Sequence, residues 1–344
     1  MLKAVILFVV GLVFLIFGGD WFVDGAVSIA KRLRVPEILI GSTIVSIGTT
    51  LPEVMVSATS AAMGHGSVAY GNAVGSIICN TALILAITIA IRPADATAKD
   101  ILIPSLFFFI AAAFYAFVSY TFKNFSRFCG ITLLVIFVIY MFITVRQSIK
   151  ASRASAKEDT SDFDVMLPAK KCDIKENVKK QGIKAVRETF QHYVILLGAG
   201  AALIAVGADL LVDNGTLIAQ YFNVPESVIA LTFVALGTSL PELVTAVISL
   251  VKGHGALSLG NIIGANLFNL VLVGGLSITI SPFTVPCEKT ISGLNAALIV
   301  DVPLMIIVML ILIVPVLIRK KLSRVQGFVL LAVYAGFCVF QFCF

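Results

Sequence analysis

The chain has 344 residues, of which 59% are hydrophobic and 13% are charged, and its mean hydropathy is +1.04. These values exclude a soluble domain and predict an integral membrane protein with room for about ten spans of ~20 residues. The net charge of +6 does not indicate binding to nucleic acid, because the lysines and arginines lie between apolar segments, where membrane topology accounts for them.

Apolar runs broken by turn residues and charges predict ten transmembrane helices. The expected spans are residues 4–30, 37–63, 67–91, 101–121, 126–148, 192–219, 227–251, 257–280, 293–318 and 325–343. Five spans fall in residues 1–148 and five in residues 190–344. The segment between them, residues 149–189, mixes charges of both signs and is predicted to be a polar linker with a short amphipathic helix toward Arg187.

The two halves of the chain repeat each other. GTTLPE at residues 48–53 recurs as GTSLPE at residues 237–242. When the second half is aligned with the first so that these two motifs coincide, roughly 26 of the 66 positions from Gly18 to Leu83 are identical. Each half has an odd number of spans, so two homologous halves must cross the membrane in opposite directions. We therefore expect an all-α fold of two inverted five-helix repeats, with broken helices near the middle of the membrane.

The basic residues predict the orientation of the spans. If the N-terminus is outside the cell, 21 of the 25 lysines and arginines lie on the inner side, and the exceptions are Lys3, Lys123, Arg127 and Lys289. Positive residues favour the cytoplasmic side of a membrane. We therefore expect a multi-pass protein of the cell membrane with both termini outside and the linker 149–189 in the cytoplasm.

The second span carries a glutamate beside a predicted helix break. Gly48 lacks a side chain and Pro52 lacks an N–H, so the helix should kink there and free carbonyl groups near Thr49. Glu53 follows Thr49 by four residues and Thr50 by three, which places the three side chains on one helical face. The matching residues of the seventh span are Gly237, Thr238, Ser239, Pro241 and Glu242.

A carboxylate at membrane depth is costly, so two at equivalent positions indicate shared use on a cation. The alternative is that glycine and proline only kink a packed helix, while each glutamate snorkels to water or stays protonated. Glu53 is some 10 residues from the nearer end of its span, too far for snorkelling to reach water.

The third and eighth spans repeat a pattern of asparagine and glycine. Steps of four place Asn72, Ser76 and Asn80 on one stripe of the third span. Their counterparts in the eighth span are Asn261, Ala265 and Asn269. Asn72 and Asn261 fit interhelical hydrogen bonding equally well, whereas Asn80, Ser76 and Asn269 are better ligand candidates. Beside them, GxxxG pairs at Gly71 and Gly75, and at Gly260 and Gly264, predict close helix contacts.

Together these groups predict an oxygen-lined cation site. Two carboxylates, two to four backbone carbonyls and two amide oxygens would supply the six to eight oxygens that Ca²⁺ prefers, without the histidines or thiols that softer metals need. We expect no resident cofactor and no enzymatic activity, because neither a nucleophile with its base nor a Walker motif is evident.

Other polar residues have simpler interpretations. His65 and His254 each lie in a GHG turn and are interpreted as turn residues at the membrane surface. Two pairs spaced four residues apart are interpreted as interfacial structural contacts: Asp20 with Asp24, and Asp209 with Asp213. Asp301 has no counterpart in the other half and is not assigned. The six cysteines show no metal spacing and are interpreted mainly as small apolar residues.

The doubled motifs, GTTLPE with GNAVGS and GTSLPE with GNIIGAN, resemble those of the cation/calcium exchanger superfamily, specifically its prokaryotic sodium/calcium exchanger branch. The resemblance covers nearly the whole chain. It implies an antiporter that exchanges Na⁺ for Ca²⁺ across the bilayer by alternating access. The alternatives are a Ca²⁺/H⁺ exchanger and a passive cation channel. Gly75 and Gly264 stand where proton-coupled relatives usually have an acidic residue, which favours sodium coupling.

The resemblance also implies roles for individual residues. Glu53 and Glu242 would form the central Ca²⁺ site with the carbonyl groups of Thr49 and Thr238. The implied Na⁺ ligands are Thr50, Ser76 and the Ser46 carbonyl on one side, and Ser239 and the Ala235 carbonyl on the other, with Asn80 and Asn269 completing the centre. Ala265 replaces a serine common in relatives, so the number and affinity of the Na⁺ sites are not predicted. Asn269 replaces a common aspartate, which lowers the negative charge at the centre. The sequence does not predict the oligomeric state.

Overall fold

The computed structural model describes residues 2–93, 98–163, 175–221, 237–287, 290–291 and 293–343. The longer helices are α1 (Leu2–Leu33), α3 (Ser46–Ala62), α4 (Gly66–Cys79), α6 (Ala98–Thr121), α7 (Arg127–Phe163), α8 (Lys175–Tyr221), α11 (Leu240–Val251), α12 (Gly255–Phe268), α14 (Val302–Arg319) and α15 (Arg324–Cys343). The short helices are α2 (Glu37–Ile40), α5 (Ala86–Ile91) and α13 (Gly275–Ile280). Four π-helical turns extend these helices: η1 (Gly41–Val45), η2 (Asn80–Leu85), η4 (Asn269–Gly274) and η5 (Ala297–Asp301).

The all-α membrane fold predicted from the sequence is confirmed. Within the described residues, nine helical segments are long and apolar enough to cross a membrane, and they match nine of the ten predicted spans. The described part of the remaining span is the shorter apolar helix α11, because residues 227–236 of that span lie outside the described residues. In the predicted linker, α7 continues to Phe163 and α8 begins at Lys175.

The two repeats have opposite orientations in the membrane. The GHG turn of the first repeat lies at the end of α3 where Gly66 packs against Phe283. The GHG turn of the second repeat lies at the other end of the second span, where His254 pairs with Glu37 at distances of 3.0 and 3.1 Å. Since residues 37 and 64 bound the same span, the two matching turns lie at opposite ends of the bundle. Both turns contain a glycine with φ +84°, as expected for a tight turn.

Two short β-ladders join loops at the bundle surface. In the first, β1 (Asn124–Phe125) pairs antiparallel with β2 (Phe283–Thr284), which connects the loop after α6 to the loop after α13. The second pairs β3 (Thr290–Ile291) with β4 (Leu294–Asn295) just before η5. The first ladder therefore ties the two repeats together at one end.

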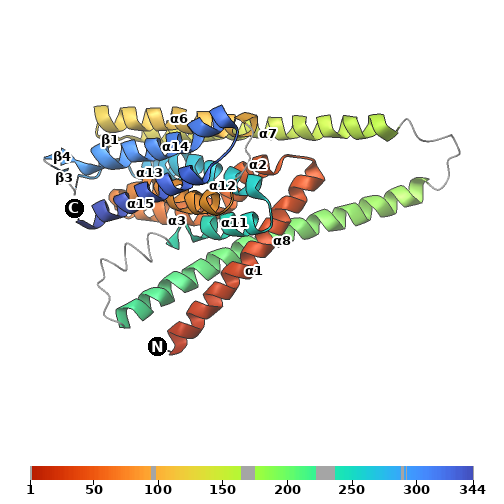
Figure 1. The fold of residues 1–344 in the computed structure, drawn as a ribbon, viewed down its shortest axis with the longest axis horizontal. Helices are drawn as coiled ribbons and strands as arrows, with labels where there is room; N and C mark the ends of the chain where they lie inside the picture. The colour runs from red at the N-terminus through yellow and green to blue at the C-terminus, as the bar shows by residue number, and fades with distance from the viewer. Residues whose placement is uncertain are drawn as a thin grey trace.

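Helices α1 and α8 form a pair that crosses the rest of the bundle at an angle (Figure 1). They run antiparallel along a seam of glycines. A Cβ added at Gly11 would lie 2.8 Å from the Gly207 carbonyl oxygen, and one at Gly18 would lie 3.0 Å from that of Gly200. Small residues let helix backbones approach closely in a membrane, so this seam joins α1 and α8 over most of their shared length.

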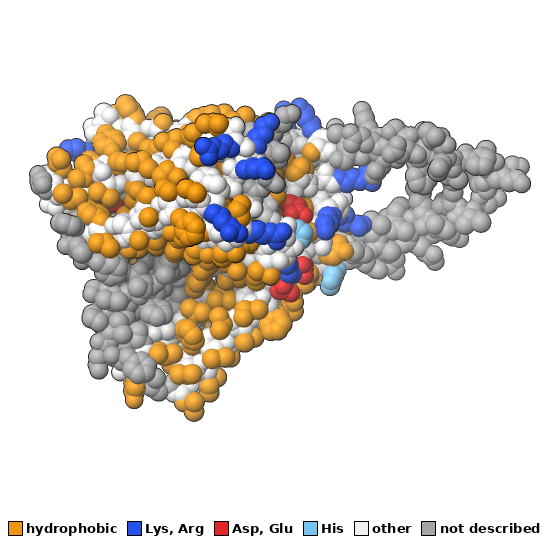
Figure 2. Space-filling model, in the orientation of Figure 1, with side chains coloured by type: hydrophobic (Ala, Val, Ile, Leu, Met, Phe, Trp, Pro, Cys, Tyr) orange, Lys and Arg blue, Asp and Glu red, His pale blue; other side chains and the backbone are white. Residues whose placement is uncertain are grey.

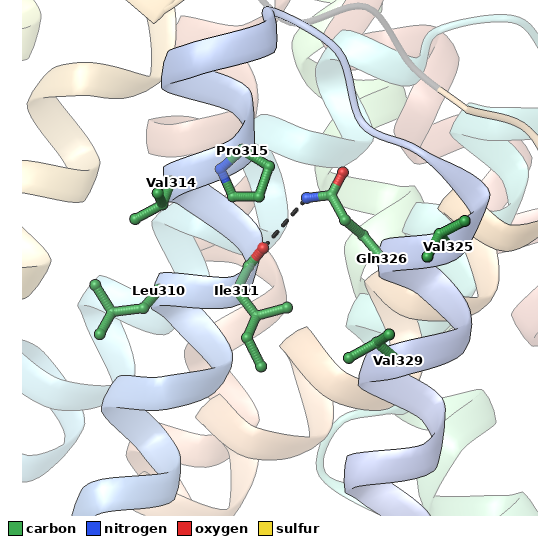
Figure 3. A pocket seen from close by; sticks show the side chains of 7 residues that line it. All are labelled: Leu310, Ile311, Val314, Pro315, Val325, Gln326 and Val329. Atoms are coloured by element: carbon green, nitrogen blue, oxygen red, sulfur yellow. Dashed lines mark hydrogen bonds between the residues drawn. The ribbon is translucent and has the colours of Figure 1, made fainter.

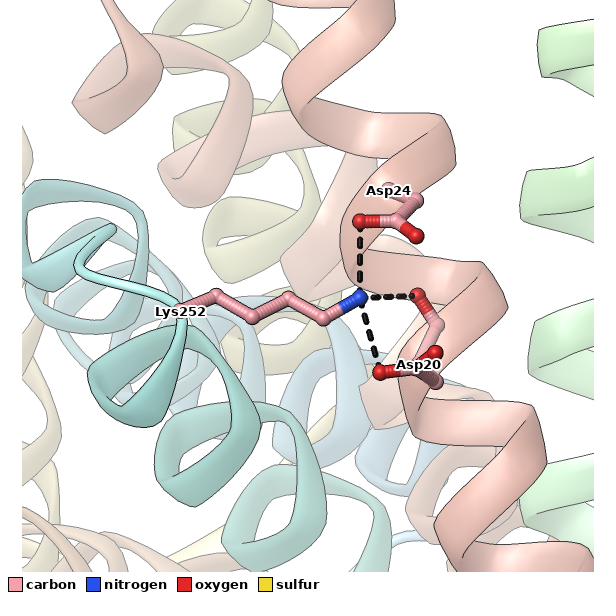
Figure 4. Close-up of polar contacts among 3 residues, drawn as sticks. All are labelled: Asp20, Asp24 and Lys252. Atoms are coloured by element: carbon pink, nitrogen blue, oxygen red, sulfur yellow. Dashed lines mark hydrogen bonds and ion pairs between the residues drawn. The ribbon is translucent and has the colours of Figure 1, made fainter.

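An ion pair connects α1 to the turn between α11 and α12 (Figure 4). Lys252 Nζ lies 2.7 Å from a carboxylate oxygen of Asp20 and 2.7 Å from one of Asp24, and it also donates to the Asp20 carbonyl at 3.2 Å. The interpretation of Asp20 and Asp24 as structural contacts therefore agrees with the structure. Of the other residues set aside, Asp301 accepts a hydrogen bond from Gln341 at 3.4 Å.

The surface has the division expected of a membrane protein. Figure 2 shows hydrophobic side chains over much of the visible face, whereas lysines and arginines gather toward one end of the bundle. Exposed side chains along the spans are large and apolar, as in Phe17 of α1, Phe117 of α6 and Val138 of α7. This surface is suited to contact with lipid along the spans and with water at the ends.

Candidate cation-binding site

The site is built from four helices at the centre of the bundle. Helices α3 and α4 come from the first repeat and α11 and α12 from the second; α3 packs against α4, and both α11 and α12 contact α3. The spans containing α4 and α12 are the most enclosed of the described spans, with 72% and 83% of an 18-residue apolar stretch of each buried. This enclosure separates the centre from lipid.

Glu53 of α3 and Glu242 of α11 are completely buried, with 0% of each residue exposed. Thr50 Oγ1 donates a hydrogen bond to Glu242 Oε1 at 3.4 Å, so the second carboxylate reaches the helix that carries the first. Both carboxylate oxygens of Glu53 and Oε2 of Glu242 have no hydrogen-bond partner among the described residues. A buried carboxylate without compensation is strongly unfavourable, so these oxygens are suited to a cation.

Asn80 and Asn269 come from opposite repeats and begin turns that pack against the helices carrying the glutamates. Each is fully buried and begins a π-helical turn, η2 and η4. The turn at Asn80 packs against α11 and the turn at Asn269 packs against α3 and α4. Neither side-chain amide has a hydrogen-bond partner within the described part of the chain. Single π-turns are frequent at functional sites, and here they place two amide groups beside the carboxylate helices.

Two matched hydrogen bonds cross between the repeats. Thr49 Oγ1 donates to Asn261 Oδ1 at 3.2 Å, and at the equivalent positions Thr238 Oγ1 donates to Asn72 Oδ1 at 3.2 Å. Asn72 also donates to Ser57 Oγ at 2.7 Å. Asn72 and Asn261 therefore hold helices together, which is the structural role that the sequence left open for them. These two threonine–asparagine bonds are referred to below as the clasps.

The remaining predicted ligands have different surroundings. Ser46 donates to the Gly41 carbonyl at 2.7 Å and to the Asn261 carbonyl at 2.9 Å. Ser239 is buried, and its hydroxyl has no partner among the described residues. Ser76 is buried on α4. Ala235 lies outside the described residues.

The predicted helix breaks differ between the repeats. In the second repeat, Thr238 and Ser239 form a turn before α11 begins at Leu240, and residues 222–236 before this turn lie outside the described residues. In the first repeat α3 continues through Pro52, and the irregular segment is the π-turn η1 one turn earlier. The bond from Ser46 Oγ to the Gly41 carbonyl supports that π-turn, so the first helix is distorted rather than interrupted.

The predicted GxxxG contacts are present in the eighth span. A Cβ on Gly260 would collide with the Ile38 carbonyl, and one on Gly264 would collide with Ser46 and lie 2.7 Å from the Ser42 Cα. No described atom lies within 4 Å of a Cβ placed on Gly71 or Gly75. Their symmetry-related partner would be residues 227–235, which lie outside the described residues.

One buried polar cluster was missed by the sequence comparison. Asn266 Nδ2 donates to Thr81 Oγ1 at 2.6 Å and to Met309 Sδ at 3.2 Å, while its own Oδ1 has no partner in the described residues. Asn266 corresponds to Ile77 in the first repeat, so a search for matched polar residues passes over it. The only sequence feature that could have identified Asn266 is an amide side chain in an apolar run, without a polar counterpart in the first repeat.

A small cavity lies between the site and the α1–α8 pair. Its volume is about 10 Å³, and its lining residues are Phe22, Gly48, Thr49, Pro52, Ala201, Ile204, Ala205 and Pro241. This space is about the size needed for one water molecule. Both motif prolines face it, so the cavity marks where α1 and α8 cover the site.

The donor set suits a hard cation. It consists of carboxylate, amide, hydroxyl and carbonyl oxygens, and no three His, Cys, Asp or Glu residues gather anywhere in the part of the chain that the structure describes. Oxygen ligands of this kind are those that Ca²⁺ and other hard cations prefer.

Comparison with known proteins agrees with this chemistry. The family described as "Sodium/calcium exchanger protein" matches residues 3–146 and 192–343. The chain is 32% identical over 340 residues to the putative antiporter CaxA of Alkalimonas amylolytica, covering 98% of both chains. It is 30% identical to the sodium/calcium exchanger MaX1 of Methanosarcina acetivorans, again with 98% of each chain covered.

Solved structures give the same result. The structure of the sodium-calcium exchanger NCX_Mj soaked with Na⁺ and Sr²⁺ superposes with a TM-score of 0.75 at 28% identity, covering 97% of both chains. A second structure of that exchanger, soaked with Na⁺ and without Ca²⁺, gives a TM-score of 0.74 at 29% identity over 96% of both chains. The chain is therefore a multi-pass membrane protein that belongs to the sodium/calcium exchanger family.

Proposed function

We propose that this protein exchanges Na⁺ for Ca²⁺ by alternating access, with the cation held between Glu53 and Glu242. The observation that carries the proposal is that three carboxylate oxygens of these residues are fully buried without a hydrogen-bond partner among the described residues. The bond from Thr50 to Glu242 supports their joint use, because it brings groups from both repeats to one place.

In this proposal, further oxygens complete the ion shell. The carbonyl groups of Thr49 and Thr238 join the two glutamates at the Ca²⁺ site, and Asn80 and Asn269 flank it. The proposed Na⁺ ligands are Thr50, Ser76, Ser239 and the carbonyl groups of Ser46 and Ala235. Ala265 supplies no hydroxyl on the second side, so the Na⁺ site there has one ligand fewer.

Charge balance provides the coupling. Two ionised glutamates give the site a charge of about −2, which one Ca²⁺ or two Na⁺ ions neutralise. An empty site would have to be enclosed with both charges uncompensated, which is costly in a low-dielectric interior. That cost prevents the unloaded protein from changing its access and so enforces exchange. A third Na⁺ would make transport sensitive to voltage, at ~2.3 kcal/mol per elementary charge per 100 mV.

Access alternates as the α1–α8 pair slides across the core. The glycine seam makes the two helices move together, and their contacts with the core include the Phe22 ring beside Gly48 and the Lys252 ion pair. We assign both termini to the outside and the linker to the cytoplasm. This topology puts the end of α5 and the start of α15 on the same side of the membrane, which agrees with the 3.4 Å contact between Arg324 and the Ile91 carbonyl.

The test is ⁴⁵Ca²⁺ uptake into proteoliposomes loaded with Na⁺. We expect an outward Na⁺ gradient to drive uptake, and Glu53→Gln and Glu242→Gln to reduce it at least ~100-fold, to the level of empty liposomes. Glu37→Gln is the matched control, because Glu37 is partly exposed at the end of the bundle; it should keep at least half of the wild-type rate.

Three results would contradict the proposal. Uptake driven by a pH gradient and indifferent to Na⁺ would indicate a Ca²⁺/H⁺ exchanger. Uptake that needs no counter-ion gradient would indicate a passive channel. Full activity in both glutamate variants would remove the proposed site itself.

A further inference from the structure

A groove opens on the side of the bundle between α14 and α15 (Figure 3). It has a volume of about 430 Å³ and is lined by Leu310, Ile311, Val314, Pro315, Val325, Gln326 and Val329. The walls are apolar apart from Gln326. Val325 is 70% exposed and Val329 is 44% exposed, so the groove faces outward to lipid rather than inward to the cation site.

The only polar side chain in the groove is already engaged by protein. Pro315 lacks an N–H, which leaves the Ile311 carbonyl without its helical donor. Gln326 Nε2 supplies that donor at 3.2 Å, and its Oε1 accepts from the Ser323 N–H at 2.8 Å. The groove therefore offers an apolar surface and suits a hydrocarbon chain rather than a polar ligand.

The start of α15 packs closely against α5, and the groove lies on the other side of α15, toward α14. A Cβ on Gly327 would lie 2.8 Å from both the Ala86 carbonyl oxygen and the Ala90 nitrogen of α5. This close approach holds the start of α15 against α5, while Gln326 bridges the wider gap to α14. The position of α15 beside the groove is thus set by a backbone contact with α5 and a side-chain hydrogen bond to α14.

A cluster of positive charge lies at the end of this groove. Four exposed basic residues lie between the last residue of α14 and the first residue of α15, both included: Arg319, Lys320, Lys321 and Arg324. Arg324 contacts the Ile91 carbonyl, which adds the neighbouring Arg92, also exposed, to the cluster. No aspartate or glutamate occurs in the sequence after Asp301. Four residues separate Pro315 from Arg319, so the charges begin ~6 Å along the helix from the groove.

We propose that this groove and basic loop bind one anionic phospholipid, with its phosphate on residues 319–324 and an acyl chain between α14 and α15. Membrane topology alone would account for positive residues at this end of the bundle, but it does not place a preformed apolar groove beneath them. A phospholipid joins a negative headgroup to a hydrocarbon chain and so matches both parts. The proposal does not depend on the transported ions.

The experiment measures lipid binding to the purified full-length protein in phosphatidylcholine nanodiscs by native mass spectrometry, with dioleoylphosphatidylglycerol as the probe. Arg319→Gln with Lys320→Gln should weaken binding roughly 25-fold, at about five-fold for each charge removed near the membrane surface. Lys123→Gln with Arg127→Gln removes the same charge from the loop at β1 and should change binding less than about two-fold. Val329→Trp fills the groove and should weaken binding at least ~five-fold.

The thermal unfolding midpoint in phosphatidylcholine alone verifies that each variant is folded. An equal loss in the Lys123 and Arg127 variant would show only general attraction and overturn the proposal. Unchanged binding in Val329→Trp would exclude the groove, and unchanged binding in the Arg319 and Lys320 variant would indicate a neutral lipid. Inorganic phosphate that displaces the lipid at equal concentration would indicate a free-anion site instead.

Discussion

The helices around the cation site and the α1–α8 pair are held in different ways. In the site, α12 lies against α2 and η1 through Gly260 and Gly264, and the two clasps add hydrogen bonds between the repeats. By contrast, α1 and α8 contact each other through a glycine seam and expose much of their length, with 22% of an 18-residue apolar stretch of each span buried. The first arrangement fixes the positions of the helices around the site, whereas the second leaves the α1–α8 pair with a mainly apolar contact to the core.

In the proposed mechanism, the helices around the site bind the ion and the α1–α8 pair moves. Polar bonds have preferred distances, so the clasps favour one arrangement of α3, α4 and α12. The α1–α8 pair instead meets the core largely through apolar contacts, as between Gly19 and the side chains of Val244 and Ile248. Apolar contacts are not directional, so in the proposed mechanism this pair shifts while the proposed ligands stay in place. Three substitutions test this comparison.

The largest effect is expected in the core. In Gly260→Val the added side chain would collide with the Ile38 carbonyl, which is backbone and cannot rotate away. We expect a loss of about 3 kcal/mol in the free energy of unfolding, visible as little or no monodisperse protein in fluorescence-detected size exclusion. Gly336→Val is the control, because no described atom lies within 4 Å of a Cβ there. Equal yields of the two variants would mean that the core is not tightly fixed.

A smaller and different effect is expected in the seam. In Gly18→Val the added Cβ would lie 2.8 Å from the Leu203 Cβ and 2.9 Å from the Ile204 nitrogen, which forces α1 and α8 apart. We expect transport to fall about ten-fold, or ~1.4 kcal/mol, while ⁴⁵Ca²⁺ binding stays within two-fold of wild type. Gly198→Val, with open space in the described structure, should leave both unchanged. Loss of binding together with transport would show that the seam shapes the site.

The smallest effect is expected at the ion pair that joins the two regions. Lys252→Gln should reduce the free energy of unfolding by about 0.5 kcal/mol, because exposed ion pairs contribute little. Partial burial alone would lower the pKa of Lys252, but its hydrogen bonds to Asp20 and Asp24 raise that pKa above its ordinary value of 10.5.

The raised pKa fixes the direction of the pH dependence. A raised lysine pKa stabilises the fold fully below pH 10.5, and this contribution is lost only as the pH rises through the higher folded-state value. The difference in unfolding midpoint between wild type and Lys252→Gln should therefore be constant from pH 7 to 9 and shrink above about pH 10.5. Lys150→Gln, at an exposed position on α7, should show no such difference. A midpoint difference that changes between pH 7 and 9 would contradict this assignment.

The sequence predicted much of this architecture because the information was local or repeated. Ten apolar runs and an odd number per half were enough for the inverted repeats, and the doubled glutamate motif led to the centre. Glu53 and Glu242 stood out because a carboxylate among apolar residues is conspicuous in any membrane span. The GHG turns could also be predicted from the sequence, because glycine permits the positive φ that Gly64 and Gly253 adopt.

Other features depend on which helix faces pack against each other, and this cannot be predicted from a single sequence. The π-turns at Asn80 and Asn269 carry no residue signature, because they follow from the packing of whole helices. The unmatched Asn266 finds its partners Thr81 and Met309 far away in the chain. In the first repeat, Ser46 supports a π-turn one turn before the position where proline suggested a break. Tertiary contacts decided each of these cases.

The clasps have a consequence for the dependence of each repeat on the other. Thr49 bonds to Asn261 and Thr238 to Asn72, so each threonine is paired with the asparagine of the other half rather than with that of its own. A protein of half the length would contain only one of the two site glutamates and only part of the proposed set of ligand oxygens. On this geometry, a protein of one repeat would need a second copy inserted in the opposite direction to complete the clasps.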